Sequence, residues 1–65
     1  MTKHQRLVHV RAHEDVAEFG SIAEAIARDE YQIATSDIPA ERRFMRQVVG
    51  YLYHLLTVAN SEIGV

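Results

Sequence analysis

Residues 39–60 constrain the fold more than any other segment, because their apolar residues form two seams of a helix instead of one. Pro39 suits the first turn of a helix, and no later proline interrupts the segment. The first seam steps by four and three residues, as in a coiled coil, through Met45, Val49, Leu52, Leu56, Ala59 and Ile63. The second seam repeats these steps one residue earlier, about 100° around the helix, through Phe44, Val48, Tyr51, Leu55 and Val58. A helix with so wide an apolar face needs cover on two sides.

Residues 14–34 predict a shorter amphipathic helix that can cover one of those sides. Its apolar residues recur at spacings of three, four or their sums, at Val16, Phe19, Ala23, Ile26 and Ile33. Gly20 interrupts this pattern, and Ser21 begins a Ser-x-x-Glu sequence typical of a capping box. A firm helix can therefore begin at Ile22, with residues 14–19 as a separate turn or a frayed extension.

Residues 5–13 alternate between two sets of side chains, which predicts a short strand. Arg6, Val8, Val10 and Ala12 fall on one side of an extended chain, and the residues between them fall on the other. A single strand cannot satisfy its own backbone groups, so it would pair with a symmetry mate or remain a loose arm.

The fold expected from these segments is all-α: a two-helix hairpin with a short N-terminal extended arm, forming a four-helix homodimer. Residues 1–65 make a single domain, with the arm over 1–13 and helices over 14–34 and 39–60. A chain of 65 residues buries only a thin core, and without cysteine it has neither disulfides nor thiolate metal sites to stabilise it. A second copy is then the expected source of the missing cover. The dimer interface is predicted at Met45, Val49, Leu52, Leu56 and Ala59.

The net charge of −2 conceals a zoned distribution. Residues 1–13 carry no acid, residues 14–34 carry six acids against Arg28 alone, and Arg42, Arg43 and Arg46 crowd the first turns of the second helix. The helix dipole already makes that end positive, so these arginines need compensation. Either Glu41 and the acidic first helix neutralise them within the dimer, or they bind an acidic partner surface or phosphates.

The long helix leaves a narrow polar stripe opposite its seams, containing Arg43, Gln47, Gly50, His54, Thr57 and Ser61, with Arg46 and Tyr53 at its edge. Tyrosines are favoured at protein interfaces. Tyr31 and Tyr53 fall near polar edges, and together with the three arginines they are the predicted partner-binding residues.

Catalysis has little support in the sequence, and no enzyme, catalytic residue, cofactor or metal is expected. Ser21, Ser36 and Ser61 fall at predicted helix ends, where capping explains them. His9 and His13 have a spacing that suits metal binding on a helix, but in an extended segment that spacing places nothing together. Neither a secretion signal nor an apolar run of about 20 residues is present, which predicts a cytoplasmic protein without membrane contact.

A short cysteine-free chain whose two helices contain residues 21–27 and 44–52 resembles, in format, small phage-encoded inhibitors of host proteins such as quorum-sensing anti-activators. That resemblance implies a regulator that binds and inhibits or modulates another protein, such as a host transcriptional regulator. One alternative is DNA binding by a ribbon-helix-helix dimer that presents Gln5, His9 and Arg11 to the major groove. The low pI, near 6.0, weighs against it. A structural subunit of a larger assembly is the other alternative.

Overall fold

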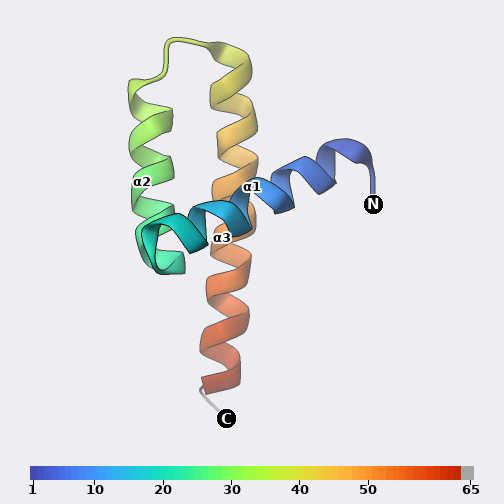
Figure 1. Cartoon of the computed structure of the whole chain (residues 1–65), viewed down its shortest axis with the longest axis vertical. Helices are drawn as coiled ribbons and strands as arrows, with labels where there is room; N and C mark the ends of the chain where they lie inside the picture. Colours follow the sequence, from blue (N-terminus) through green and yellow to red (C-terminus); the bar gives the residue numbers. More distant parts are fainter. Residues whose placement is uncertain (64–65) are drawn as a thin grey trace.

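The computed structural model describes the backbone of residues 1–63 and the side chains of residues 1–61, and within this range the regular structure is entirely helical. Its elements are α1 (Lys3–Phe19), α2 (Ile22–Thr35) and α3 (Pro39–Ile63). Helix α2 runs antiparallel to the first half of α3, and α1 lies across this pair (Figure 1). The second half of α3 extends beyond both neighbours. The expectation of an all-α fold is therefore confirmed.

The predicted two-helix hairpin with an extended arm over residues 1–13 is wrong, because these residues form most of a third helix. Thr2 and Gln5 begin α1 with a capping box: the Thr2 hydroxyl accepts from the Gln5 amide at 3.1 Å, and the Gln5 side chain accepts from the Thr2 amide at 2.9 Å. Val8 and Ala12, one helical turn apart, are both buried. Without a strand in residues 1–63, the ribbon-helix-helix alternative loses the element that would read DNA.

Gly20 and Ser21 separate α1 from α2. The sequence predicted a firm helix from Ile22, but it assigned residues 14–19 to a separate turn or a frayed extension, whereas they complete α1. Gly20 adopts a left-handed conformation with φ of +94°, and its amide donates to the Val16 carbonyl at 2.9 Å. Glycine reaches this conformation without the steric penalty of a Cβ atom. The Ser21 hydroxyl then accepts from the Glu24 amide at 3.0 Å and begins α2. The chain therefore turns sharply between the two helices, so that α1 lies across α2 (Figure 1).

All three helices contribute to the hydrophobic core, which consists of Val8, Ala12, Ala25, Ile26, Met45, Val48, Val49 and Leu52. Residues of both α3 seams are in this set, because α1 covers the side of α3 that was expected to need a second chain. Met45, Val49 and Leu52 are thus buried within one chain, although the sequence placed them at a dimer interface. Leu56 and Ala59, from the same predicted interface, are only partly buried.

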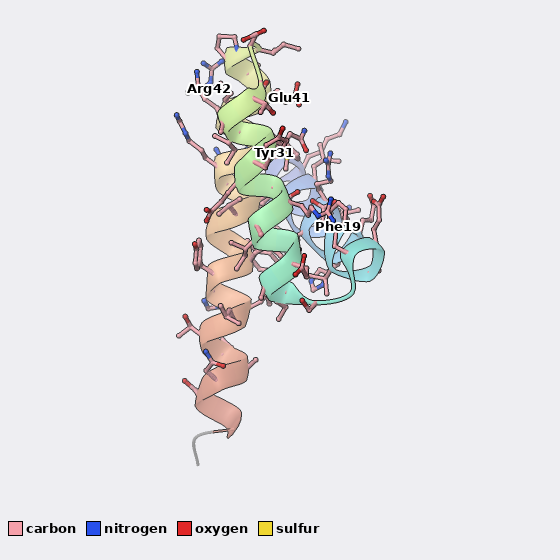
Figure 2. All side chains as sticks on the ribbon, turned by 90° about the vertical axis from the view of Figure 1, so that its left-hand side faces the viewer. Phe19, Tyr31, Glu41 and Arg42 are labelled. Carbon is pink, nitrogen blue, oxygen red and sulfur yellow. The ribbon has the colours of Figure 1, made fainter. Side chains whose placement is uncertain are left out.

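The second half of α3 continues the two seams into a region where neither α1 nor α2 accompanies it (Figures 1 and 2). Leu55 and Leu56 are half-buried at the edge of the core, and Val58 is 41% exposed. The side chain of Ile63, which the sequence placed in the first seam, lies outside the described residues. None of the helices within residues 1–63 is both long enough and apolar enough to cross a membrane.

Candidate functional site

A network of polar side chains joins the three helices beside the hydrophobic core. Arg11 of α1 donates from Nε to both carboxylate oxygens of Asp15, at 3.1 and 3.2 Å, and from Nη2 to Gln32 of α2 at 3.3 Å. The Gln32 amide in turn donates to Glu41 of α3 at 2.6 Å. Asp29 of α2 contacts Asp15 in the same place, and the two aspartates are 1% and 3% exposed, respectively. Polar groups therefore fix the relative positions of all three helices.

Asp29 is the most perturbed ionisable group among the described residues. Burial raises its pKa from 3.8 to about 7; the hydrogen bond with Asp15 and the negative charge of Asp15 add to the rise, and Arg11 opposes it. Its Oδ2 atom is buried and has no hydrogen-bond partner within residues 1–61. Burying an uncompensated charge is costly. Asp29 therefore stays protonated at pH values well above those at which an aspartic acid usually loses its proton.

Sequence reasoning missed this network because it interpreted the acids of residues 14–34 as a solvated face. A signal was nevertheless present. Asp29 follows Ile26 by three residues and precedes Ile33 by four, so it lies on the apolar stripe of its helix. Asp15 follows Ala12 by three residues, but its place on an apolar stripe is visible only once residues 3–19 are read as a helix.

Four of the five predicted partner-binding residues lie on the exposed side of α3. Arg42, Arg46 and Tyr53 follow one another at spacings of four and seven residues, which places them along one stripe, and Arg43 is adjacent to it. Arg42 extends from the first turns of α3 at the end of the molecule (Figure 2). All four side chains are exposed. The structure therefore provides one continuous surface, here called the arginine–tyrosine stripe, formed by Arg42, Arg46, Gly50 and Tyr53.

The fifth residue, Tyr31, lies on α2, and its side chain is 71% exposed (Figure 2). The neighbouring Glu30 accepts a hydrogen bond from the Tyr53 hydroxyl at 2.6 Å, which links this part of α2 to the arginine–tyrosine stripe. That hydrogen bond, with the negative charge of Glu30, raises the pKa of Tyr53. Tyr53 is 48% exposed, so much of the residue is accessible although its hydroxyl is engaged.

The sequence predicted that Glu41 and the acidic first helix could neutralise the three arginines, but the described residues form no such ion pairs. Glu41 accepts from Gln32 instead, and the ion pair among residues 1–61 joins Arg11 and Asp15. Arg42, Arg43 and Arg46 have no ion pair within that range. Within residues 1–61 the acidic side chains of α2 and the second half of α1 do not approach the arginines within ion-pair distance, although Glu30 of α2 reaches the stripe at Tyr53.

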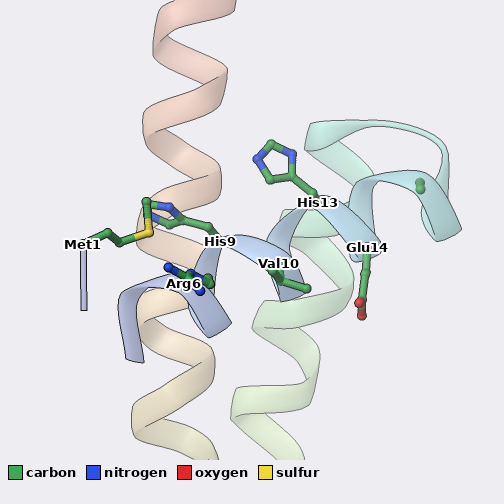
Figure 3. A pocket seen from close by; sticks show the side chains of 7 residues that line it. Met1, Arg6, His9, Val10, His13 and Glu14 are labelled. Carbon is green, nitrogen blue, oxygen red and sulfur yellow. The ribbon is translucent and has the colours of Figure 1, made fainter. Parts of the chain in front are cut away.

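A second cluster surrounds Tyr51 on the side of α3 that faces α1. The His9 ring stacks on Tyr51 with centroids 3.9 Å apart, and His13 Nε2 lies 3.1 Å from the Tyr51 hydroxyl. His9 and His13 also line a shallow pocket on the outer face of α1, together with Met1, Arg6, Val10, Glu14 and Ala17 (Figure 3). The metal-suited spacing of the two histidines is thus realised on a helix, but both rings pack against Tyr51. No three His, Asp or Glu side chains within the described residues are placed to hold a metal ion.

The serines considered as nucleophiles lie where the sequence placed them, at or near helix ends. Ser21 caps α2, and Ser36 follows α2 and accepts from the Ile38 amide at 3.2 Å. Ser61 is exposed near the end of α3. None of the three has a side-chain hydrogen bond to a histidine or a carboxylate within the described residues, so the geometry brings together no nucleophile and base.

Comparisons with known proteins do not place the chain in a family. Its sequence matches no protein-family model, and searches of curated proteins and of solved structures gave no match. The function is therefore inferred from the two features described above, the arginine–tyrosine stripe and the polar network between the helices.

Proposed function

We propose that this protein is a small non-enzymatic regulator that acts as a homodimer and binds another protein, which it inhibits or modulates. The arginine–tyrosine stripe, flanked by Arg43 and Tyr31, is the partner-binding surface, and an acidic surface of the target is its complement. The resemblance in format to phage-encoded inhibitors makes a transcriptional regulator the first class of target to test.

The uncompensated arginines are the observation that carries this proposal. Arg42 and Arg46 lie one helical turn apart, and like charges at that spacing destabilise a helix by about 0.2–0.5 kcal/mol. Arg42 is also close to the positive end of the helix dipole, which adds a further unfavourable term. Because no acid within residues 1–61 pairs with them, the folded chain retains this cost. Carboxylates of a bound partner would remove it and would form charge-assisted hydrogen bonds with the guanidinium groups.

Gly50 supports a close approach by a partner at the middle of the same stripe. A glycine inside a helix costs about 0.5–1 kcal/mol relative to alanine. No atom of the described chain lies within 4 Å of the position that a Cβ atom would occupy at Gly50. Packing within the chain therefore does not require glycine there. A partner backbone that approaches α3 between Arg46 and Tyr53 would require it.

The second half of α3 is the surface that we assign to the homodimer. Leu55 and Leu56 lie at the edge of the core, Val58 and Ala59 continue the seams past it, and all four are partly exposed. Residues 47–61 contain no Lys, Arg, Asp or Glu. A two-fold symmetric interface packs the same surface patch of both copies together, so a patch without charged residues avoids repulsion between like charges. Leu56 and Ala59 remain from the predicted interface, whereas Met45, Val49 and Leu52 do not.

The proposal is tested by affinity purification of the tagged protein from lysate, with and without nuclease, beside Arg42→Ala/Arg46→Ala. We expect one nuclease-resistant protein to be retained in stoichiometric amount by the wild-type chain and to be largely lost from the double variant. Arg6→Ala/Arg28→Ala is the matched control, because it removes the same charge from exposed sites on α1 and α2. This control should retain the partner.

Three outcomes would contradict the proposal. Equal loss of the partner from both double variants would show that net charge, and not the stripe, controls binding. Recovery of nucleic acid that disappears with nuclease would instead show that the arginines contact phosphates. A wild-type chain that aggregates when expressed alone would favour the alternative of a subunit from a larger assembly.

A further inference from the structure

The pair formed by Asp15 and Asp29 is the one feature of the core that neither packing nor the proposed function explains. Asp15 comes from α1 and Asp29 from α2, and both are almost completely buried beside the apolar residues that hold these helices together. Carboxylates are rarely buried unless they are paired with a cation or a hydrogen-bond donor. Two of them in contact therefore require a specific chemical arrangement.

The available donors suffice for only one of the two carboxylates. The Arg11 guanidinium contacts both oxygens of Asp15, which makes Asp15 the member that is stabilised as an anion. Asp29 has a buried Oδ2 atom without a partner within residues 1–61. A proton on Asp29 supplies the missing donor, because a protonated carboxyl group can donate to the neighbouring Asp15 carboxylate. Without this proton, two negative charges would share a buried site with one guanidinium group.

We propose that Asp15 and Asp29 together form a buried proton-binding site that fastens α1 to α2. With the proton bound, Asp29 donates to Asp15 and the two helices are held by a hydrogen bond in the core. When the proton leaves, the two carboxylates repel each other and α1 is held less firmly against the rest of the molecule. The ligand of this site is a proton.

The charged and polar groups that the three helices place around the pair favour the state in which Asp29 holds the proton. On α1 the site faces Asp15 and Arg11, and the positive charge of Arg11 only partly offsets the charge of Asp15. On α2 the network continues from Arg11 to Gln32, which is neutral. On α3 the network ends at Glu41, which is reached through Gln32 and contributes a further negative charge. No second cation joins the network within the described residues.

The direction of the pH dependence follows from the pKa of Asp29, which burial raises from 3.8 to about 7. Between these values the folded chain holds a proton that the unfolded chain has released, so folding becomes less favourable as the pH rises. The stabilisation of the folded chain by this proton is complete below about pH 4 and is lost once the pH passes about 7. Within this window the unfolding equilibrium constant should rise by up to about tenfold per pH unit through this site.

Asp29→Asn tests the proposal, because asparagine keeps the shape and can donate to Asp15 but cannot lose a proton. Urea unfolding of the full chain is measured from pH 4 to pH 8.5 for the wild type, for Asp29→Asn and for the control Glu18→Gln. Glu18 is an exposed acid on α1, so the control makes the same carboxyl-to-amide change outside the core. Histidines and the other acids are common to all three chains, and their contribution cancels in the differences.

We expect the free energy of unfolding of the wild type to fall relative to that of Asp29→Asn as the pH rises from about 4 to about 7. Above pH 7 the two profiles should run parallel. Glu18→Gln should follow the wild type throughout. Parallel profiles for wild type and Asp29→Asn would overturn the proposal. If Asp29→Asn does not fold, the carbon chemical shift of the Asp29 carboxyl group in the wild type gives the answer instead. A titration midpoint near 7 supports the proton-binding site, and a midpoint near 4 overturns it.

Discussion

The two halves of α3 carry the same apolar pattern but have different surroundings. In the first half, Met45, Val48 and Leu52 are almost completely buried between α1 and α2. In the second half, Leu55 and Leu56 still pack against the edge of the core but are only partly buried, and Val58, beyond that edge, is 41% exposed. A seam of apolar residues therefore predicts that a helix will be covered, but it does not specify which chain provides the cover.

This difference separates residues that maintain the fold from residues that are available for association. The first half of α3 uses its seams within the chain, since α1 and α2 supply both neighbours. The second half leaves apolar side chains partly exposed to solvent, because the core of the described chain does not cover them fully. Substitution of corresponding residues in the two halves should therefore affect different properties of the protein.

Leu52→Asp should have the largest effect, because Leu52 is fully buried where the three helices meet. A carboxylate at this position would be charged and unpaired in the core, which costs about 4 kcal/mol or more. That is most of the stability expected for a domain of this size. We expect circular dichroism to show an unfolded chain at 25 °C. A folded Leu52→Asp protein would contradict the division of α3 into a core half and an open half.

Leu56→Asp makes the same change one turn further along the first seam and should leave the fold largely intact. Leu56 is only partly buried, so its side chain can reach water with a modest shift. We expect the helical signal to be retained and the dimer to be lost, with sedimentation velocity showing a shift from dimer to monomer. A wild-type chain that is already monomeric at high micromolar concentration would disprove the dimer part of the proposed function, while leaving the core assignment unaffected.

The α3 segment also shows how far the sequence alone could lead. Its length, its two seams and its exposed polar stripe all follow from periodicity, and the Ser-x-x-Glu sequence located the start of α2. The sequence did not predict that α1 covers the second seam. Residues 5–13 alternate as a strand would, so they were assigned to an extended arm. The Thr2–Gln5 capping box favoured a helix there, and tertiary packing of Val8 and Ala12 outweighed the alternation.

The candidate surfaces were predictable to different degrees. The arginines and tyrosines were identified from charge and residue type, since exposed residues keep their sequence-level properties when the chain folds. The Asp15–Asp29 contact depends on how α1 crosses α2, and a single sequence holds no information on crossing geometry when one of the two helices is misassigned. Buried pairs of like charge also violate the general rule that acids face the solvent, so no pattern predicts them directly.

Gly50→Ala should have the smallest effect on the fold. It tests the exposed side of α3 at the point where the two halves of the helix meet. Alanine should stabilise the helix by about 0.5–1 kcal/mol, because it loses less backbone entropy on folding and an added Cβ atom meets nothing within 4 Å. If a partner approaches closely at Gly50, the same methyl group should weaken partner binding, as measured by titration calorimetry with the purified target. A variant that is both more stable and less able to bind would separate folding from function at one position. Unchanged binding would show that the partner contacts only the longer side chains of Arg42, Arg46 and Tyr53.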